Sequence, residues 1–129
     1  MNLIYEKEYY RVKEACIKVR RFLGNGFLEK VYENSLKIEL ENQGFQVETQ
    51  KEILVKYDDK IVGQYFADIV IDGKIIIELK TVDKIVQIHK LQLLNYLKAT
   101  GYDLGLIINF PNNYRGFKIE RVPNFIDKP

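Results

Sequence analysis

The chain has 129 residues, of which 47% are hydrophobic and 29% are charged. This length and balance fit a single globular domain over residues 1–129, with one hydrophobic core. The 20 basic and 18 acidic residues leave a net charge of +2, which by itself does not indicate nucleic acid or an anionic membrane as a partner. Cys16 is the only cysteine, so an internal disulfide is excluded and a reducing compartment is expected.

The sequence carries no pattern that would direct it to a membrane. The first fifteen residues lack the apolar core of a signal peptide. The longest apolar runs, such as residues 75–77, are far shorter than the ~20 residues that a membrane-spanning helix needs. We therefore expect a soluble cytoplasmic protein with no membrane partner.

Two helices are predicted at the start of the chain and a third near its end. Apolar residues at steps of three and four over residues 5–23 mark one face of an amphipathic helix. A second helix is predicted over residues 27–43, with Gly44 at its C-terminal cap. Helical spacing returns over residues 83–100.

After Gly44 the apolar period changes to two, which predicts strands over residues 45–57, 61–71 and 74–81. Residues 104–110 form a nearly all-apolar run, typical of a buried strand, and residues 117–122 suit a last edge strand. The order ααβββαβ predicts an α/β fold with a central mixed sheet flanked by helices. A right-handed parallel crossover should join the third strand to the fourth.

The second and third strands carry charges within an apolar hairpin, which turns at Asp72-Gly73. Because side chains alternate along a strand, each of these strands should have one purely apolar face and one face that holds its charges. The predicted apolar faces consist of Ala67, Ile69 and Ile71 in one strand and Ile75, Ile77 and Leu79 in the other. The charged faces hold Asp68, Glu78 and Lys80.

The length of the hairpin loop decides whether these charges meet. A two-residue turn would align the apolar face of one strand with the charged face of the other. A three-residue loop over 71–73, with Gly73 left-handed, keeps like faces together. This register sets Asp68 opposite Ile76 and places Glu78 on the diagonal, with Cα atoms about 7–8 Å apart. We therefore predict the odd-length loop.

Two adjacent carboxylates repel each other unless a positive charge lies between them. Carboxylate oxygens suit Mg²⁺ or Mn²⁺ better than Zn²⁺, and Lys80 shares a face with Glu78. A divalent ion there would lower the pKa of a bound water and neutralise phosphate charge. The same residues also fit a structural ion pair on a solvated face of the sheet.

Asp68, followed on the next strand by Glu78-Leu79-Lys80, resembles the D…E-x-K core of the PD-(D/E)XK nuclease superfamily. Residues 26–32 (GFLEKVY) are similar to the signature of the bacterial GxxExxY family within that superfamily. Residues 92–96 (QLLNY) resemble the QxxxY motif of its RecB-type members. The resemblance spans about residues 5–110, although Ala67 stands where many members have proline.

The resemblance implies a restriction-endonuclease-like core and a metal site. Asp68, Glu78 and the backbone carbonyl of Leu79 would bind Mg²⁺ or Mn²⁺. Lys80 would orient or activate the attacking water.

The resemblance also assigns roles to residues of two helices. Glu29 would contact the metal directly or through water, although an acid at that place also suits the first turn of a helix. Gln92 and Tyr96, one helical turn apart, would position Lys80, the metal-bound water or the DNA backbone; they also fit a polar helix edge. Tyr32 lies on the apolar stripe of its helix and is expected to pack.

Two functions from different classes follow. The first is a metal-dependent phosphodiesterase that hydrolyses nucleic acid, with DNA as the expected substrate. The alternative is a non-catalytic nucleic-acid- or protein-binding module that keeps the nuclease fold. For a chain this small, a homodimer or a partner domain is expected to help hold the substrate.

Overall fold

The computed structural model describes residues 3–124, which form three helices and five strands. Each predicted helix and strand is present within a few residues, except that the third helix begins four residues later than predicted. The elements are α1 (Glu6–Leu23), α2 (Glu29–Asn42), β1 (Val47–Tyr57), β2 (Lys60–Ile71), β3 (Ile75–Lys80), α3 (Gln87–Thr100), β4 (Leu104–Asn109) and β5 (Lys118–Pro123).

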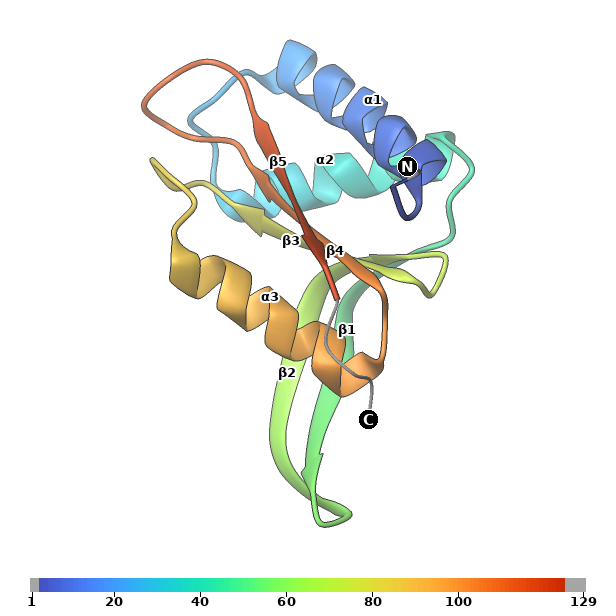
Figure 1. The fold of residues 1–129 in the computed structure, drawn as a ribbon. Coiled ribbons are helices and arrows are strands. Elements are labelled where there is room, and N and C mark those ends of the chain that lie inside the picture. The colour runs from blue at the N-terminus through green and yellow to red at the C-terminus, as the bar shows by residue number, and fades with distance from the viewer. Residues whose placement is uncertain (1–2, 125–129) are drawn as a thin grey trace.

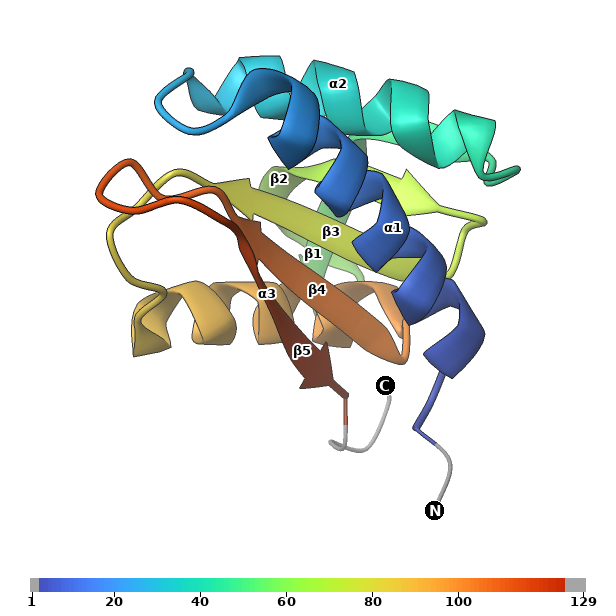
Figure 2. The same ribbon diagram turned by 90° about the horizontal axis from the view of Figure 1, so that it is seen from above.

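The strands form one mixed sheet in the order β1-β2-β3-β4-β5 (Figure 1). β3 and β4 are parallel and the other neighbours are antiparallel, which confirms the predicted parallel step across α3. Figure 2 shows three layers, with α1 and α2 on one face of the sheet and α3 on the other. The predicted α/β architecture is therefore confirmed. Within residues 3–124, no helix combines the length and the apolarity that crossing a membrane requires.

The side chains of β3 divide the core into two clusters because they alternate between the faces of the sheet. Ile75, Ile77 and Leu79 pack with the cluster beneath α1 and α2, which also buries Cys16. Ile76 packs with the cluster beneath α3. Burial on both faces explains why β3 is almost continuously apolar.

Helix α3 lies very close to the sheet. A Cβ atom added to Gly105 of β4 would come within 2.7 Å of the Leu93 side chain, which is itself fully buried. Only glycine leaves room for this approach. The close contact fixes the position of the helix that carries Gln92 and Tyr96.

The β1–β2 hairpin extends well beyond the body of the sheet (Figure 1). The part near its tip is exposed and carries large apolar side chains, among them Tyr57, Ile61 and Val62. The inner part of the hairpin, near Ile69 and Ile71, is buried. The hairpin therefore forms an arm whose root belongs to the core.

The loop between β2 and β3 has three residues, as predicted, but its position differs from the prediction. Ile71 pairs with Ile75, so the loop is 72–74 rather than 71–73. Asp72 and Gly73 both have left-handed backbones, with φ of 51° and 61°. The Asp72 carboxylate also accepts a hydrogen bond of 2.9 Å from the backbone N–H of Gln46. Since Asp tolerates this conformation and its side chain is anchored, both strands stay paired up to Ile71 and Ile75.

This shift corrects the predicted register at the charged end of the hairpin. The ladder pairs Ile69 with Ile77, so the next step brings Asp68 opposite Glu78 and not opposite Ile76. The odd loop length still keeps like faces together for the paired residues. The two carboxylates are therefore direct neighbours rather than diagonal ones.

The predicted side-chain alternation fails at Asp68. Ala67 packs beneath α3, whereas Ile69 packs beneath α1 and α2, although the two were expected to share a face. The cause lies in β1, where Gln50 has a left-handed backbone with φ of 51°. The β1–β2 ladder skips the Gln50–Asp68 position, and the alternation of β2 moves by one residue there.

Candidate functional site

The candidate site lies where β2 and β3 separate. Their pairing ends at Ile69 and Ile77, beyond which β2 continues into the arm. At this fork the backbone N–H of Leu79 donates a hydrogen bond of 2.8 Å to a side chain of β2, at Oδ2 of Asp68. The Asp68 carboxylate thus takes the place of a strand carbonyl and is held at the end of the ladder.

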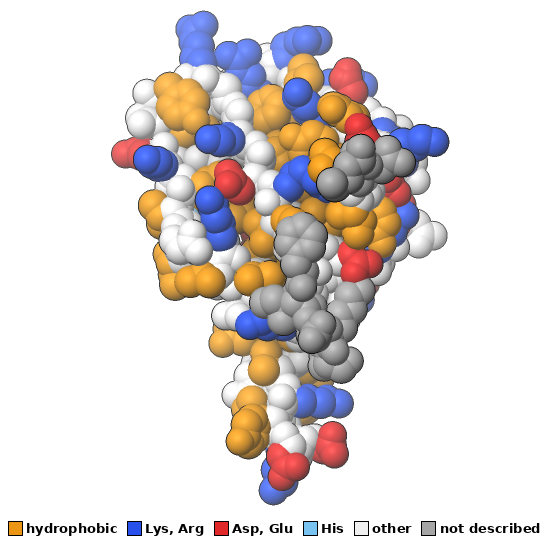
Figure 3. Space-filling view, viewed as in Figure 1, with side chains coloured by type: hydrophobic (Ala, Val, Ile, Leu, Met, Phe, Trp, Pro, Cys, Tyr) orange, Lys and Arg blue, Asp and Glu red, His pale blue; other side chains and the backbone are white. Residues whose placement is uncertain are grey.

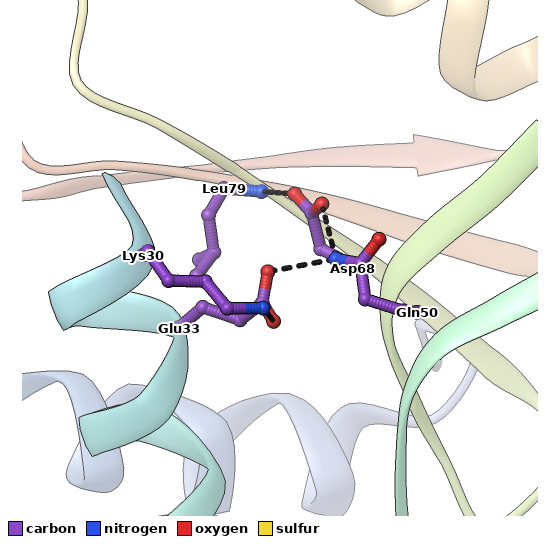
Figure 4. A network of polar contacts seen from close by, with 5 residues as sticks. All are labelled: Lys30, Glu33, Gln50, Asp68 and Leu79. Carbon is purple, nitrogen blue, oxygen red and sulfur yellow. Dashed lines mark hydrogen bonds and ion pairs between the residues drawn. The ribbon is translucent and has the colours of Figure 1, made fainter. Parts of the chain in front are cut away.

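A polar network connects Asp68 to α2 (Figure 4). The side-chain amide of Gln50 donates to Oε1 of Glu33 at 3.0 Å and to Oδ1 of Asp68 at 3.4 Å. Glu33 is almost fully buried and forms an ion pair of 2.7 Å with Lys30. The amide therefore keeps the acid of α2 and the acid of β2 close together without direct contact between like charges.

Glu78 lies beside Asp68 and is shielded from solvent over much of its side chain. Its Oε1 atom is buried and has no hydrogen-bond partner among the described residues. Burial, followed by the negative charge of Asp68, raises the pKa of Glu78 from 4.5 to about 9, against the opposing charge of Lys80. The fold therefore holds two acids at a separation that disfavours a second negative charge.

Glu29 of α2 lies within electrostatic reach of Asp68 and Lys80. Glu29 is the first residue of α2. Its pKa is raised by burial and by the charge of Asp68, while Lys80 at the end of β3 lowers it. The structure thus brings together the predicted site residues of α2, β2 and β3.

Gln92 and Tyr96 border the site from α3. The Gln92 side-chain amide donates a hydrogen bond of 3.0 Å to the Tyr96 hydroxyl. Burial and the charge of Glu78 raise the pKa of Tyr96, and the bond from Gln92 opposes that rise. Gln92 therefore orients Tyr96, and Tyr96 lies within electrostatic reach of Glu78.

The oxygen atoms at the fork fit a hard divalent cation. The unpartnered Oε1 of Glu78 and the neighbouring Asp68 carboxylate offer two oxygen ligands, and a backbone carbonyl at Leu79 would add a third. No group of three or more Asp, Glu, His or Cys side chains that could hold a metal occurs within residues 3–124. The side-chain ligands would therefore be two carboxylates, with backbone and water oxygens for the rest.

Tyr32 packs, as expected from its place on the apolar stripe. It is fully buried and stacks on Phe110 with ring centroids 4.4 Å apart. Its hydroxyl donates to the carbonyl of Gly24 at 2.8 Å and accepts from the N–H of Phe27 at 3.3 Å. Tyr32 thus anchors the loop that leads into Glu29.

The sequence analysis missed Glu33 and Gln50. Glu33 could have been found, because it follows Glu29 by four residues and so shares its helix face. Gln50 gives no such signal, since its position depends on a left-handed backbone that glutamine rarely adopts. His89, the only histidine of the chain, accepts a hydrogen bond of 3.1 Å from the N–H of Val86 and caps α3.

Taken together, a mixed sheet between helices and a carboxylate pair at a strand fork define a nuclease-type α/β core of the restriction-endonuclease-like class. A family model described as the PD-(D/E)XK nuclease superfamily matches residues 6–122. The chain therefore belongs to this superfamily. Its members generally use divalent metal ions, and their substrates are nucleic acids.

Two solved structures share the fold. One is the crystal structure of SSO0001, at 22% sequence identity and a TM-score of 0.60, with 95% of this chain and 61% of that chain covered. The other is an alkaline exonuclease (LHK-Exo) from Laribacter hongkongensis, at 12% identity and a TM-score of 0.55, with 96% and 72% covered. The chain thus spans about three fifths of the length of SSO0001. Comparison with curated proteins found no match.

Proposed function

We propose that this chain is a metal-dependent phosphodiesterase that hydrolyses nucleic acid, with DNA as its substrate. The observation that carries the proposal is the buried Glu78 carboxyl, which has an unpartnered oxygen and lies beside Asp68. Such a pair lowers the stability of the fold when it is empty, and pairs of this kind occur at functional sites where a bound cation neutralises the acids. The shared fold with an alkaline exonuclease supports the same reaction class.

In this proposal Asp68, Glu78 and the carbonyl of Leu79 hold Mg²⁺ or Mn²⁺. A divalent ion there supplies charge neutralisation at the scissile phosphate and a lower pKa for its bound water. Lys80 places its ammonium beside the same phosphate and orients the attacking water. The Gln50 amide keeps Asp68 in position through its hydrogen bond.

The remaining roles follow the resemblance to two subgroups. Glu29, within the GxxExxY pattern of residues 26–32, acts on the metal through water, since no third acidic side chain of residues 3–124 joins the pair as a ligand. Gln92 and Tyr96, as a QxxxY pair, orient water or the nucleic-acid backbone on the α3 side. We also propose that a second copy or a partner domain completes the substrate-binding surface, and that the protein acts in the cytoplasm.

The first experiment measures cleavage of supercoiled and linear DNA with saturating Mg²⁺ or Mn²⁺. We expect cleavage by the wild type and a loss of at least about 100-fold for Asp68→Asn and for Lys80→Ala. Asp58→Asn, at the exposed tip of the arm, is the matched control and should cleave like the wild type. Full activity of Asp68→Asn or Lys80→Ala would refute the assigned site.

Calorimetric titration with Mn²⁺ separates the enzyme from the non-catalytic module. The wild type should bind the ion, and Glu78→Gln should bind it at least about tenfold more weakly. Binding of Mn²⁺ without cleavage of any DNA or RNA would favour the module. Failure to bind any divalent ion would refute the metal site itself.

A further inference from the structure

A large groove lies between the β1–β2 arm and α3. Its volume is about 1050 Å³, and eleven residues line it. Gln92 and Tyr96 are among these residues. Tyr96 is also close enough to Glu78 for the charge of Glu78 to raise its pKa. The groove therefore begins at the candidate site and leads away from it along the arm.

The lining of the groove combines apolar surface with positive charge. Leu54 and Tyr65 from the arm face Ile88 and Leu91 from α3, and all four are substantially exposed. Figure 3 shows hydrophobic side chains along the projecting arm. Lys56 and Lys98 also line the groove, and no acidic residue does. The site and its surroundings thus differ in charge, with acids at the fork and cations along the groove.

We propose that this groove binds an unpaired nucleic-acid strand and leads it to the fork. The proposal rests on the proposed function and adds the form of the substrate. A single strand exposes flat base faces, which stack on aromatic rings, and carries phosphates, which attract lysines. A duplex keeps its base faces stacked inside, so it would leave the apolar lining uncovered.

Tyr65 is the residue that stacks. Its side chain is 46% exposed, and its ring lies 5.4 Å from that of Tyr96, which is almost fully buried. Tyr96 thus supports one part of the ring while another part faces the groove. Lys56 and Lys98 are exposed, and neither forms an ion pair with another residue of the described part of the chain. Both ammonium groups are available for phosphates.

The other occupant of matching shape is an apolar segment of a protein, either from a partner or from a second copy of the chain. The two lysines favour the polyanion, because an apolar protein segment offers them no negative charge. The position of the groove favours it too, since the groove ends beside residues that would act on phosphodiesters. The experiment below includes the protein occupant as an outcome.

The test measures binding of a fluorescent oligothymidylate and of a duplex of equal length, in EDTA so that no cleavage occurs. For Lys56→Ala/Lys98→Ala, we expect the slope of log affinity against log salt for the single strand to fall by about 1.4, at about 0.7 per lost phosphate contact. Tyr65→Ala should bind the single strand at least about fivefold more weakly, and Tyr65→Phe should bind normally. Duplex binding should change little in either variant.

The matched control is Lys7→Ala/Lys13→Ala, which removes two exposed lysines from α1, on the opposite face of the sheet. It should keep the salt slope of the wild type. Strand binding by Lys56→Ala/Lys98→Ala and Tyr65→Ala equal to that of the wild type would overturn the proposal. A change in oligomeric state of Tyr65→Ala on gel filtration, with unchanged strand binding, would also overturn it and assign the groove to a protein contact.

The outcome is separable from that of the proposed function. Asp68→Asn should lose cleavage but keep strand binding, because it alters the fork and not the groove. If the wild type binds the strand through the groove but cleaves nothing, the groove proposal stands and the enzyme proposal fails. If the wild type cleaves DNA while the groove variants bind and cleave normally, the reverse holds.

Discussion

The two ends of the β2–β3 pairing differ sharply, although the same two strands form both. At the turn end, Ile71 and Ile75 are paired and fully buried. At the fork end, the strands part, and Asp68 and Glu78 face each other with a carboxyl oxygen that lacks a partner. The comparison shows that burial of apolar side chains at the turn end stabilises the hairpin and so holds the two acids in place at the fork end.

The magnitudes support this division. Burying one isoleucine side chain stabilises a fold by about 1.5–3 kcal/mol, and leaving one buried polar atom unsatisfied costs about 1–3 kcal/mol. β3 alone buries Ile75, Ile76 and Ile77 completely. Burial of these three isoleucines therefore stabilises the fold by more than the unsatisfied oxygen of Glu78 destabilises it.

The largest effect is expected for a substitution that disrupts packing at the turn end. Ile75→Ala should lower the free energy of unfolding by about 2–5 kcal/mol, because the side chain is fully buried and the cavity cannot collapse. Urea unfolding followed by circular dichroism measures this change. At temperatures where the variant stays folded, its metal affinity should remain close to that of the wild type, because the fork is unchanged.

The matched control for this variant is Ile38→Ala on α2, where the side chain is 59% exposed. Its free energy of unfolding should change by no more than about 0.5 kcal/mol. A similar loss of stability in both variants would contradict the special contribution of the turn end.

The next effect is expected at the fork end, where the free energy of unfolding should depend on pH. The pKa of Glu78 is raised from 4.5 to about 9 in the folded chain. As pH rises from about 4.5 towards 9, the unfolded chain releases this proton while the folded chain retains it, so the free energy of unfolding falls. Glu78→Gln cannot ionise. In EDTA it should therefore match the wild type at pH 4 and exceed it by on the order of 5 kcal/mol at pH 8, at about 1.4 kcal/mol per pH unit above 4.5.

Addition of metal should make the wild type more stable than Glu78→Gln. Saturating Mn²⁺ at pH 8 should stabilise the wild type through preferential binding to the folded state, whereas Glu78→Gln should gain little. Thermal unfolding with and without Mn²⁺ measures both changes. A stability difference between the two proteins that is independent of pH would contradict the raised pKa of Glu78.

The turn end was predictable from sequence and the fork end only in part. Alternation and the Asp72-Gly73 turn predict the hairpin, because a misaligned register would expose a whole apolar face. They do not predict which three residues form the loop. That choice depends on the bond from the N–H of Gln46 to Asp72, a contact across 26 residues that no local pattern encodes.

The fork itself depends on the path of the chain in three dimensions. The spacing of Asp68 and Glu78 predicts that two acids meet, and the structure brings them together. The side-chain network from Gln50 to Glu33 was not predictable, because it needs a left-handed glutamine and a helix that packs over the strand fork. The sequence therefore indicates the residues of the candidate site better than it indicates what positions them.

The smallest effect concerns Gln50, which links the fork end to α2. Gln50→Ala should lower the free energy of unfolding by about 1 kcal/mol, because it removes the hydrogen bonds to Glu33 and Asp68. Metal affinity should fall about tenfold, as is usual when a residue that orients a metal ligand is lost. Calorimetry with Mn²⁺ and urea unfolding measure the two effects.

Two further variants separate the amide from the backbone at this position. Gln50→Gly relieves the left-handed backbone, worth roughly 1 kcal/mol, but still lacks the amide. It should therefore regain stability while its metal affinity stays low. Gln46→Ala, a nearby exposed glutamine whose bond to Asp72 uses only the backbone, should change neither quantity. If Gln50→Gly instead restored metal affinity, the orientation of Asp68 would depend on the shape of β1 and not on the amide that joins it to α2.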